Sequence, residues 1–190
     1  EIGTGLVGSD MCIRDSQKGG VGKTTTVINL AAGLSKKGKK ILVIDLDPQG
    51  NATTGLGLSN IENSSDTIYG VLNGTKTINQ VIKKTDFENL DLITSNVDLS
   101  GLEVETAGDS KRAFILKDQL MAYLNDSKGT YDYIFIDCPP SLSLLTVMAL
   151  VASFSLVVPL QTEFFALEGL TQLMKTIERI KTNLNKELKI

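Results

Sequence analysis

Glycines and lysines are concentrated between residues 18 and 25, where the sequence reads Lys-Gly-Gly-Val-Gly-Lys-Thr-Thr. A polyphosphate is bound by backbone N–H groups that converge on it, and side chains would obstruct that approach, so glycines are needed. The helix that should follow adds the positive end of its dipole. Lys23 can reach the β- and γ-phosphates, and the Thr24 hydroxyl oxygen can bind Mg²⁺. We therefore predict that a nucleotide's phosphates are bound by Gly19, Gly20, Val21, Gly22, Lys23, Thr24 and Thr25.

Carboxylates follow two apolar runs that should be buried strands. Asp45 and Asp47 come after the run 41–44, and Asp137 ends the run 133–136. Ligands of open α/β sheets bind at the carboxyl ends of the strands. Mg²⁺ prefers oxygen ligands and keeps several waters, so we assign Asp137 to hold one of those waters. Asp45 is assigned to support the loop and the metal's water shell, with a role as helix cap or turn former left open.

The elements needed to position these residues alternate along the chain. We predict helices over 24–37, 66–72, 77–84, 110–124, 141–151 and 167–184, and strands over 41–44, 90–93, 131–136 and 154–159. Residues 50–60 are expected to be a loop, and Gly38 should cap the first helix. Alternating strands and helices predict an α/β fold with a mostly parallel sheet and helices on both faces. The chain stops where another strand is due, so we expect this sheet to be incomplete at both ends.

The first 16 residues do not fit this pattern. A phosphate loop is normally fed by a buried apolar strand, whereas Arg14 and Asp15 place two adjacent charges just before it. We therefore expect residues 1–16 to be a non-native leader, similar to a translated sequencing adapter, and residues 17–190 to be a single nucleotide-binding domain, truncated at its C-terminus. On this view the strand that should precede Gln17 is missing.

Composition excludes several classes of function. The formal net charge is −3, so DNA contact would need a local patch or a partner. No histidine is present, which excludes histidine acid–base catalysis, so a carboxylate is the natural group to position water. Cys138 has one other cysteine in the chain, Cys12, too few for an iron–sulfur cluster, and it is interpreted as a small buried apolar residue. No apolar run reaches the length of a membrane span.

Four segments in order resemble the ParA/Soj partitioning ATPases of the ParA/MinD family: KGGVGKTTT, LVIDLDPQGNATTGLG, YDYIFIDCPPSLSLLT and VVPLQTEFFALEGL. The resemblance spans residues 17–190. Gln17 stands where the common pattern G-x-x-x-x-G-K-[ST] has its first glycine, and the additional Lys18 matches the deviant Walker A loop of this family.

The resemblance implies an ATPase that uses ATP and Mg²⁺ in a sandwich homodimer. Lys18 would contact the ATP held by the partner subunit, and Asp47 would orient the attacking water, which makes these two the expected catalytic residues. The expected metal site consists of Thr24, Asp47 and Asp137. The resemblance further implies slow hydrolysis stimulated by a ParB-type partner, nonspecific binding of DNA in the ATP state, and a cytoplasmic, nucleoid-associated location. Residues 161–169 would lie near the dimer face.

Three other functions would use a similar phosphate loop. A MinD-like division-site ATPase would carry a C-terminal amphipathic membrane helix. A nucleotide-gated regulator of replication or sporulation would share the fold and differ in its output. A GTPase would be expected to carry Asn-Lys-x-Asp, and residues 185–188 fail at the last position. The lysines at 36, 37, 39 and 40 could contact DNA phosphates, but a solvated helix end is favoured.

Overall fold

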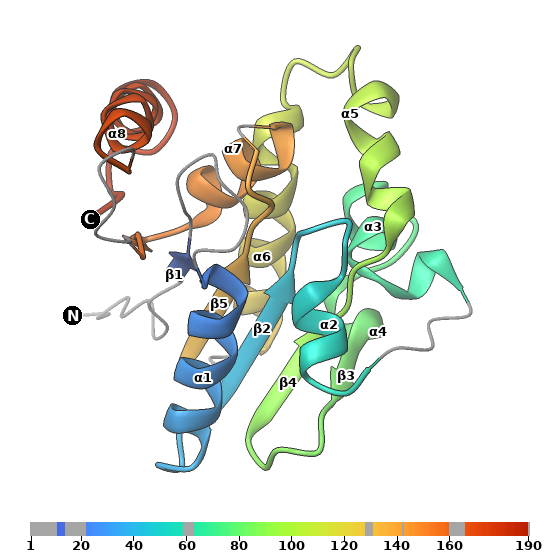
Figure 1. The fold of residues 1–190 in the computed structure, drawn as a ribbon. Coiled ribbons are helices and arrows are strands. Elements are labelled where there is room, and N and C mark those ends of the chain that lie inside the picture. The colour runs from blue at the N-terminus through green and yellow to red at the C-terminus, as the bar shows by residue number, and fades with distance from the viewer. Residues whose placement is uncertain are drawn as a thin grey trace, which may run out of the picture.

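The computed structural model describes residues 11–13, 22–58, 63–127, 131–141, 143–159 and 166–189. Its strands form one sheet in the order β3-β4-β2-β5-β1-β6. The strands are β1 (Met11–Ile13), β2 (Ile41–Asp45), β3 (Ile82–Lys84), β4 (Leu90–Ile93), β5 (Tyr133–Asp137) and β6 (Ser155–Val157). All pairs are parallel except β3 with β4, which are antiparallel. The predicted α/β fold with a mostly parallel sheet is confirmed (Figure 1).

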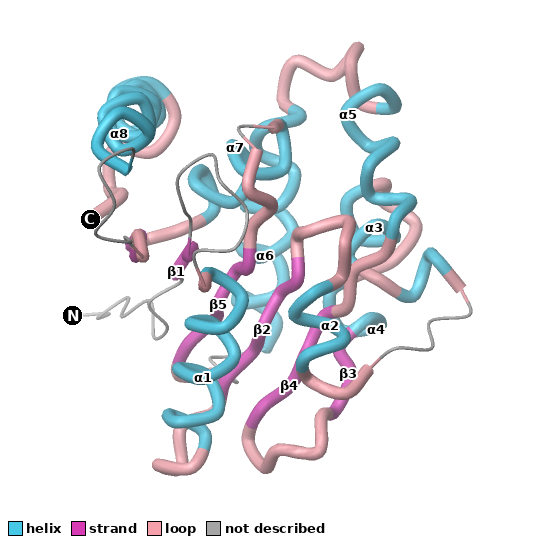
Figure 2. Tube along the Cα trace, in the orientation of Figure 1, coloured by secondary structure: helices cyan, strands magenta, loops and turns pink. Residues whose placement is uncertain are grey.

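Helices cover both faces of this sheet (Figure 2). The α-helices are α1 (Lys23–Ser35), α2 (Asn51–Gly55), α3 (Ile68–Leu72), α4 (Ile78–Val81), α5 (Leu102–Glu105), α6 (Ile115–Ser127), α7 (Leu144–Ala152) and α8 (Ala166–Asn183). Short 3-10 turns are η1 (Ser64–Asp66), η2 (Val97–Gly101) and η3 (Arg112–Phe114). No helix in the described ranges is long and apolar enough to cross a membrane.

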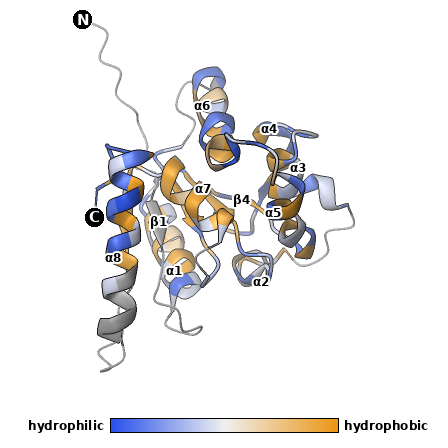
Figure 3. Cartoon of the chain, turned by 90° about the horizontal axis from the view of Figure 1, so that it is seen from above, coloured by the Kyte–Doolittle hydropathy of each residue, from blue (hydrophilic) through white to orange (hydrophobic). Residues whose placement is uncertain are grey.

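Alternate residues of the central strands point into two separate cores. Ile41 and Val43 of β2 pack with α1 and with Phe135 of β5. Leu42 and Ile44 face the other way, into a larger core built with the helices α3 to α8. Because both faces are covered, the strands are apolar throughout rather than alternating with polar residues. Seen from above, α7 is hydrophobic over most of its surface and lies between other elements, whereas α6 and α8 at the periphery carry a hydrophilic side (Figure 3).

A strand does precede the phosphate loop, contrary to our expectation. Residues Met11–Ile13 pair in parallel with β5 on one side and with β6 on the other. The backbone of this short segment therefore lies inside the sheet, between β5 and the edge strand β6. Whether residues 1–16 are native is a question of their origin, and their assignment as a foreign leader stays a prediction.

Two local assignments were wrong and one was confirmed. Residues 50–60 were expected to be a loop, but Asn51–Gly55 form α2 after Gly50 adopts a left-handed conformation with φ of 64°. The helix expected over 77–84 ends at Val81, and Ile82–Lys84 continue as the antiparallel edge strand β3. The short helix expected through Leu72, capped by Asp66 or Thr67, is present as α3, and the Thr67 hydroxyl caps it by accepting the Tyr69 N–H.

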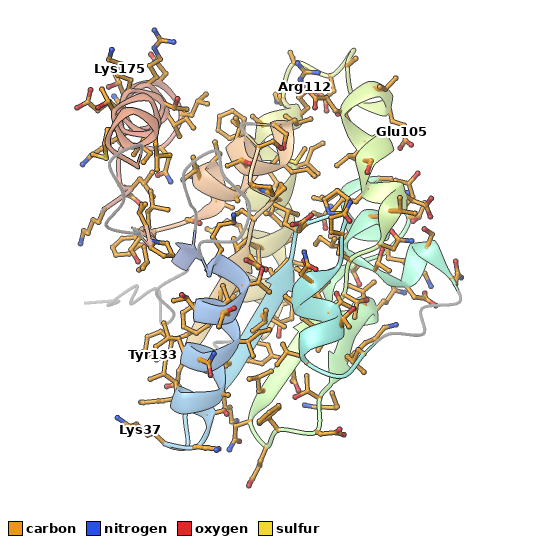
Figure 4. All side chains as sticks on the ribbon, viewed as in Figure 1. Lys37, Glu105, Arg112, Tyr133 and Lys175 are labelled. Atoms are coloured by element: carbon orange, nitrogen blue, oxygen red, sulfur yellow. The ribbon has the colours of Figure 1, made fainter. Side chains whose placement is uncertain are left out.

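The lysines that follow α1 lie at the edge of the sheet that is formed by the amino ends of the strands. Lys37, at the tip of this turn, and Tyr133, which begins β5, mark that edge in Figure 4. Lys39 Nζ lies 3.4 Å from Asp132 Oδ1, and the Lys40 backbone N–H donates to Asp132 Oδ2 over 2.8 Å. Gly38 caps the helix as predicted, with φ of 77°. These contacts agree with a solvated helix end.

Candidate nucleotide and magnesium site

Helix α1 starts at the carboxyl edge of the sheet and presents its first residues to β5. Gly22 precedes the helix with φ of 89°, a conformation that favours glycine. Lys23 is 8% exposed, although a lysine is rarely buried without a partner. The Thr24 hydroxyl donates to Asp137 Oδ2 over 2.7 Å. The structure therefore brings together Lys23, Thr24 and Asp137, three residues that were assigned to one site from their sequence motifs.

Asp137 is buried with one oxygen occupied and one open. Oδ2 accepts the Thr24 hydroxyl, whereas Oδ1 is buried and has no hydrogen-bond partner among the described residues. Burial raises the pKa of Asp137 to about 7, the Thr24 hydrogen bond opposes that shift, nearby Asp45 and Asp47 add to it, and Lys23 opposes it. An unpaired buried acceptor is rare in native proteins and calls for a partner. A hydrated cation would supply a partner for Oδ1, and its positive charge would balance the neighbouring carboxylates.

Asp45 is held by the backbone that follows it. Its Oδ1 accepts the Asp47 N–H over 3.1 Å, and its Oδ2 accepts both the backbone N–H and the hydroxyl of Thr53, each over 2.7 Å. Burial raises the pKa of Asp45 to about 6, and the hydrogen bonds from Thr53 oppose the shift. The expectation that Asp45 supports the loop fits this geometry, because its carboxylate anchors α2.

Asp47 lies in the loop 46–50 between β2 and α2, which we call the switch loop, and is 6% exposed. Its Oδ1 accepts the Gln49 N–H over 2.9 Å, and the Leu46 N–H donates to the carbonyl of Asp137 over 2.8 Å. The two acidic strand ends are therefore joined through the backbone, and the register pairs Asp45 with Asp137. A role for Asp47 at the water or the metal stays a prediction.

Part of the predicted phosphate loop falls outside the described residues. Lys18, Gly19, Gly20 and Val21 belong to that part. The side chain of Thr25 is exposed, and its carbonyl accepts the Asn29 side-chain amide over 2.8 Å. Their assignment to phosphate binding is therefore untested. Sequence reasoning missed two residues that support the Asp45 carboxylate. Thr53 lies within the quoted segment LVIDLDPQGNATTGLG, which could have drawn attention to it, whereas Ser95 contributes its backbone N–H and lies in no motif.

The oxygen atoms of Thr24 and Asp137 suit Mg²⁺, which is bound partly by water and phosphate, better than a metal that is held by protein side chains alone. Among the described residues, no group of three or more His, Cys, Asp or Glu side chains could hold a metal ion. Mg²⁺ is usually bound through one or two carboxylates together with waters and substrate phosphates. A buried open oxygen on Asp137 next to the Thr24 hydroxyl matches that requirement.

Sequence comparison relates this chain to known proteins. A family model described as an AAA domain matches residues 11–190. The chromosome partitioning protein ParA of Caulobacter vibrioides is 50% identical over 175 residues, which is 92% of this chain and 64% of the relative. Soj of Bacillus subtilis, named a sporulation initiation inhibitor protein, is 47% identical over 92% of this chain and 67% of its own. The chain belongs to the ParA/Soj family of partitioning ATPases.

Solved structures of similar proteins support the ParA/Soj fold. A plasmid partition protein from Borrelia burgdorferi matches with a TM-score of 0.77 and 32% identity, over 95% of this chain and 76% of the other. A Mycobacterium smegmatis protein titled cobyrinic acid a,c-diamide synthase, with bound ATP analogue and magnesium, matches with a TM-score of 0.85 and 36% identity, over 95% and 72%. The chain spans 64% of the length of the Caulobacter ParA that it matches.

Proposed function

We propose that this chain is an ATP-binding and ATP-hydrolysing switch that takes part in partitioning chromosomes or plasmids. The observation that carries the proposal is the Thr24–Asp137 hydrogen bond, with the open Asp137 Oδ1 and buried Lys23 beside it. Thr24 and Asp137 would hold Mg²⁺ directly or through its waters, and Lys23 with the loop amides would hold phosphates. The bound cation would neutralise charge on the phosphates during transfer to water. Asp47 would orient that water.

Magnesium-dependent ATP binding is the first test. In equilibrium dialysis, the chain should bind ATP in the presence of Mg²⁺, and Lys23→Ala should abolish that binding because the phosphates lose their buried cation. Lys37→Ala is a matched control, since Lys37 lies after the far end of α1 (Figure 4). If the unaltered chain shows no magnesium-dependent affinity for ATP, the proposal is wrong.

We infer further that the ATP state is a homodimer in which Lys18 contacts the nucleotide of the partner subunit. The extra lysine of the loop and the membership in the ParA/Soj family support this inference. Lys18→Ala should retain ATP binding by the monomer and lose ATP-dependent dimerisation and turnover. Gel filtration with a slowly hydrolysed ATP analogue distinguishes the outcomes, and normal dimerisation of Lys18→Ala would exclude the role in trans.

The partners proposed for the dimer are nonspecific DNA and a ParB-type protein. The names of the relatives, chromosome partitioning protein and plasmid partition protein, support a DNA cargo, and a cytoplasmic location on the nucleoid would follow. The family resemblance leads us to expect that binding to DNA depends on ATP, and contacts to phosphates should make it weaken steeply with salt. Since the net charge is −3, these contacts must come from a local patch. ATP turnover measured with and without DNA and a ParB-type protein tests both partners.

A second candidate is a nucleotide-gated regulator. It is favoured by one observation, the printed name of the Bacillus relative as a sporulation initiation inhibitor. Such a protein would bind a transcription or replication factor in one nucleotide state, and DNA with a ParB-type protein would not accelerate its hydrolysis. The turnover experiment therefore separates the two candidates.

A further inference from the structure

Thr53 links the end of β2, which is near it in the sequence, to the segment after β4, which is 42 residues away. The residue lies in α2 and is 3% exposed. Its hydroxyl donates to Asp45 Oδ2 over 2.7 Å at the end of β2 and accepts the backbone N–H of Ser95 over 3.0 Å, two residues after β4. We call Asp45, Thr53 and Ser95 the Thr53 relay. The buried Thr53 hydroxyl thus donates a hydrogen bond to the end of β2 and accepts one from the segment that follows β4.

The relay fixes the backbone at Asp47. Because the opposite oxygen of Asp45 accepts the Asp47 N–H, a displaced Asp45 carboxylate would release that N–H. The loop backbone also runs close to the same neighbour, since a Cβ built on Gly50 would lie 3.6 Å from the Ser95 carbonyl oxygen. The segment after β4 therefore acts as a support against which the switch loop is positioned.

Two residues of the switch loop border open space. A polar cleft of 370 Å³ has Pro48, Gln49, Thr53 and Ser95 in its lining, and a smaller cavity of 140 Å³ also borders Pro48. Close packing therefore constrains Pro48 and Gln49 only in part. The conformation of this loop therefore depends on the buried hydrogen bonds of Asp45.

We propose that Thr53 is a positioning residue for Asp47: its hydroxyl, held by the Ser95 N–H, sets the Asp45 carboxylate and through it the backbone of Asp47. The inference rests on the proposed function, because Asp47 orients a water only if the chain hydrolyses ATP. In this proposal Thr53 acts through Asp45 and not by contacting the phosphates or the attacking water. Its effect is on geometry, and small misplacements of a catalytic group reduce rates strongly.

Thr53→Val tests the hydroxyl because valine keeps the shape and removes the two hydrogen bonds of the hydroxyl, whereas the backbone N–H of residue 53 can still donate to Asp45 Oδ2. We expect kcat for ATP hydrolysis to fall about ten- to a hundredfold while KM changes less than about threefold, since ground-state phosphate binding is untouched. Thr53→Ser keeps the hydroxyl and should retain kcat within about threefold. Thr54→Val is the matched control, because the neighbouring Thr54 is exposed. This variant should hydrolyse ATP at the normal rate.

Amide hydrogen exchange gives a second measurement that needs no ATP. In Thr53→Val, the N–H of Ser95 loses its acceptor, the Thr53 hydroxyl. The acceptor of the Asp47 N–H, the Asp45 carboxylate, remains but is held less firmly. Exchange at both amides should speed up by about tenfold or more, while the amides of α6 exchange as before. Thr53→Cys, whose thiol is a weak donor, should show the same pattern and replaces the valine variant if that one does not fold.

The outcomes separate the inference from the proposed function. If the unaltered chain hydrolyses ATP and Thr53→Val retains full kcat, the inference is wrong and the proposed function stands. Equal losses in Thr53→Val and Thr53→Ser would also overturn it, since the hydroxyl would then be irrelevant, as would a parallel loss of ATP affinity. If the unaltered chain does not bind ATP, the proposed function fails, whereas the exchange of the Ser95 and Asp47 amides still reports whether the relay orders the loop.

Discussion

The Thr24 hydroxyl donates to Asp137 Oδ2 over 2.7 Å, across 113 residues of sequence. This bond ties the first turn of α1 to the end of β5, the two places where phosphate and metal ligands are expected. The hydroxyl oxygen keeps lone pairs after donating its proton, and Asp137 Oδ1 has no hydrogen-bond partner within the part of the chain that the structure describes. Both oxygens therefore have lone pairs that could bind a hydrated cation.

Thr24→Val should weaken magnesium-dependent ATP binding. Valine keeps the branched shape but removes the oxygen and the donor, so we expect ATP affinity with Mg²⁺ to fall about ten- to a hundredfold, as when other metal-site partners are lost. Affinity in EDTA should change far less, because the loop amides and Lys23 are retained. Equilibrium dialysis in both buffers measures the difference. Thr24→Ser is the control, and an equal loss in both buffers would contradict a metal role.

The stability of the metal-free protein should fall as pH rises from about 4 to about 7. The pKa of Asp137 is raised from 3.8 to about 7, chiefly by burial. Between those values the folded chain binds more protons than the unfolded chain, so the free energy of unfolding decreases with pH. The contribution is present below pH 4, is lost through pH 7, and amounts to roughly 2–4 kcal/mol in total. Urea denaturation in EDTA across this range measures it.

Asp137→Asn isolates that contribution, because asparagine does not titrate. The stability of the variant should lose the part of the pH slope that belongs to Asp137, while Asp45, whose pKa is raised to about 6 chiefly by burial, still contributes in the same direction. The difference between the two curves should therefore grow toward pH 7, with the asparagine variant relatively more stable there. Parallel curves would mean that Asp137 titrates normally in the folded chain.

The central site could be predicted from sequence because its chemistry coincides with regular elements. Apolar runs ending in Asp45 and Asp137 indicate buried parallel strands, whose carboxyl ends lie together by topology. The Gly-Lys-Thr spacing at residues 22–24 indicates the start of a helix at the same edge. These three assignments needed no knowledge of tertiary contacts, and the pairing of Asp45 with Asp137 confirms the arrangement of the strands.

The supporting residues could not be predicted, because tertiary contacts override local propensity there. Residues 51–55 contain two threonines and a glycine and should form a poor helix, yet the Asp45 carboxylate accepts the Thr53 N–H and stabilises α2. Likewise Ile82–Lys84 continue a helical pattern, but the exposed edge of β4 recruits them as a strand. Neither Asp45 as an acceptor nor β4 as an open edge is visible in the local sequence.

Gly70→Ala should destabilise the protein strongly, whereas Gly33→Ala should stabilise it. A Cβ on Gly70 would lie 2.0 Å from the backbone carbonyl oxygen of Ser65, so α3 or η1 must shift. We expect a loss of about 1–3 kcal/mol in the free energy of unfolding, as for other overpacked sites. Gly33 is helical and exposed in α1 with no atom near its Cβ position, so alanine should add about 0.5–1 kcal/mol. Urea denaturation of both variants measures the two effects.

Asp47→Ala should trap the ATP-bound dimer. Without its carboxylate the attacking water loses its orienting group, so hydrolysis should slow by about a hundredfold or more, while Lys23, Thr24 and Asp137 still hold Mg·ATP. The Asp47 N–H that donates to Asp45 belongs to the backbone and survives the substitution, so the loop should keep its conformation. Gel filtration after incubation with ATP should show a dimer that persists in the variant and decays in the unaltered chain. Hydrolysis at the normal rate would exclude Asp47 from the reaction and leave its carboxylate with the single task of capping the Gln49 N–H.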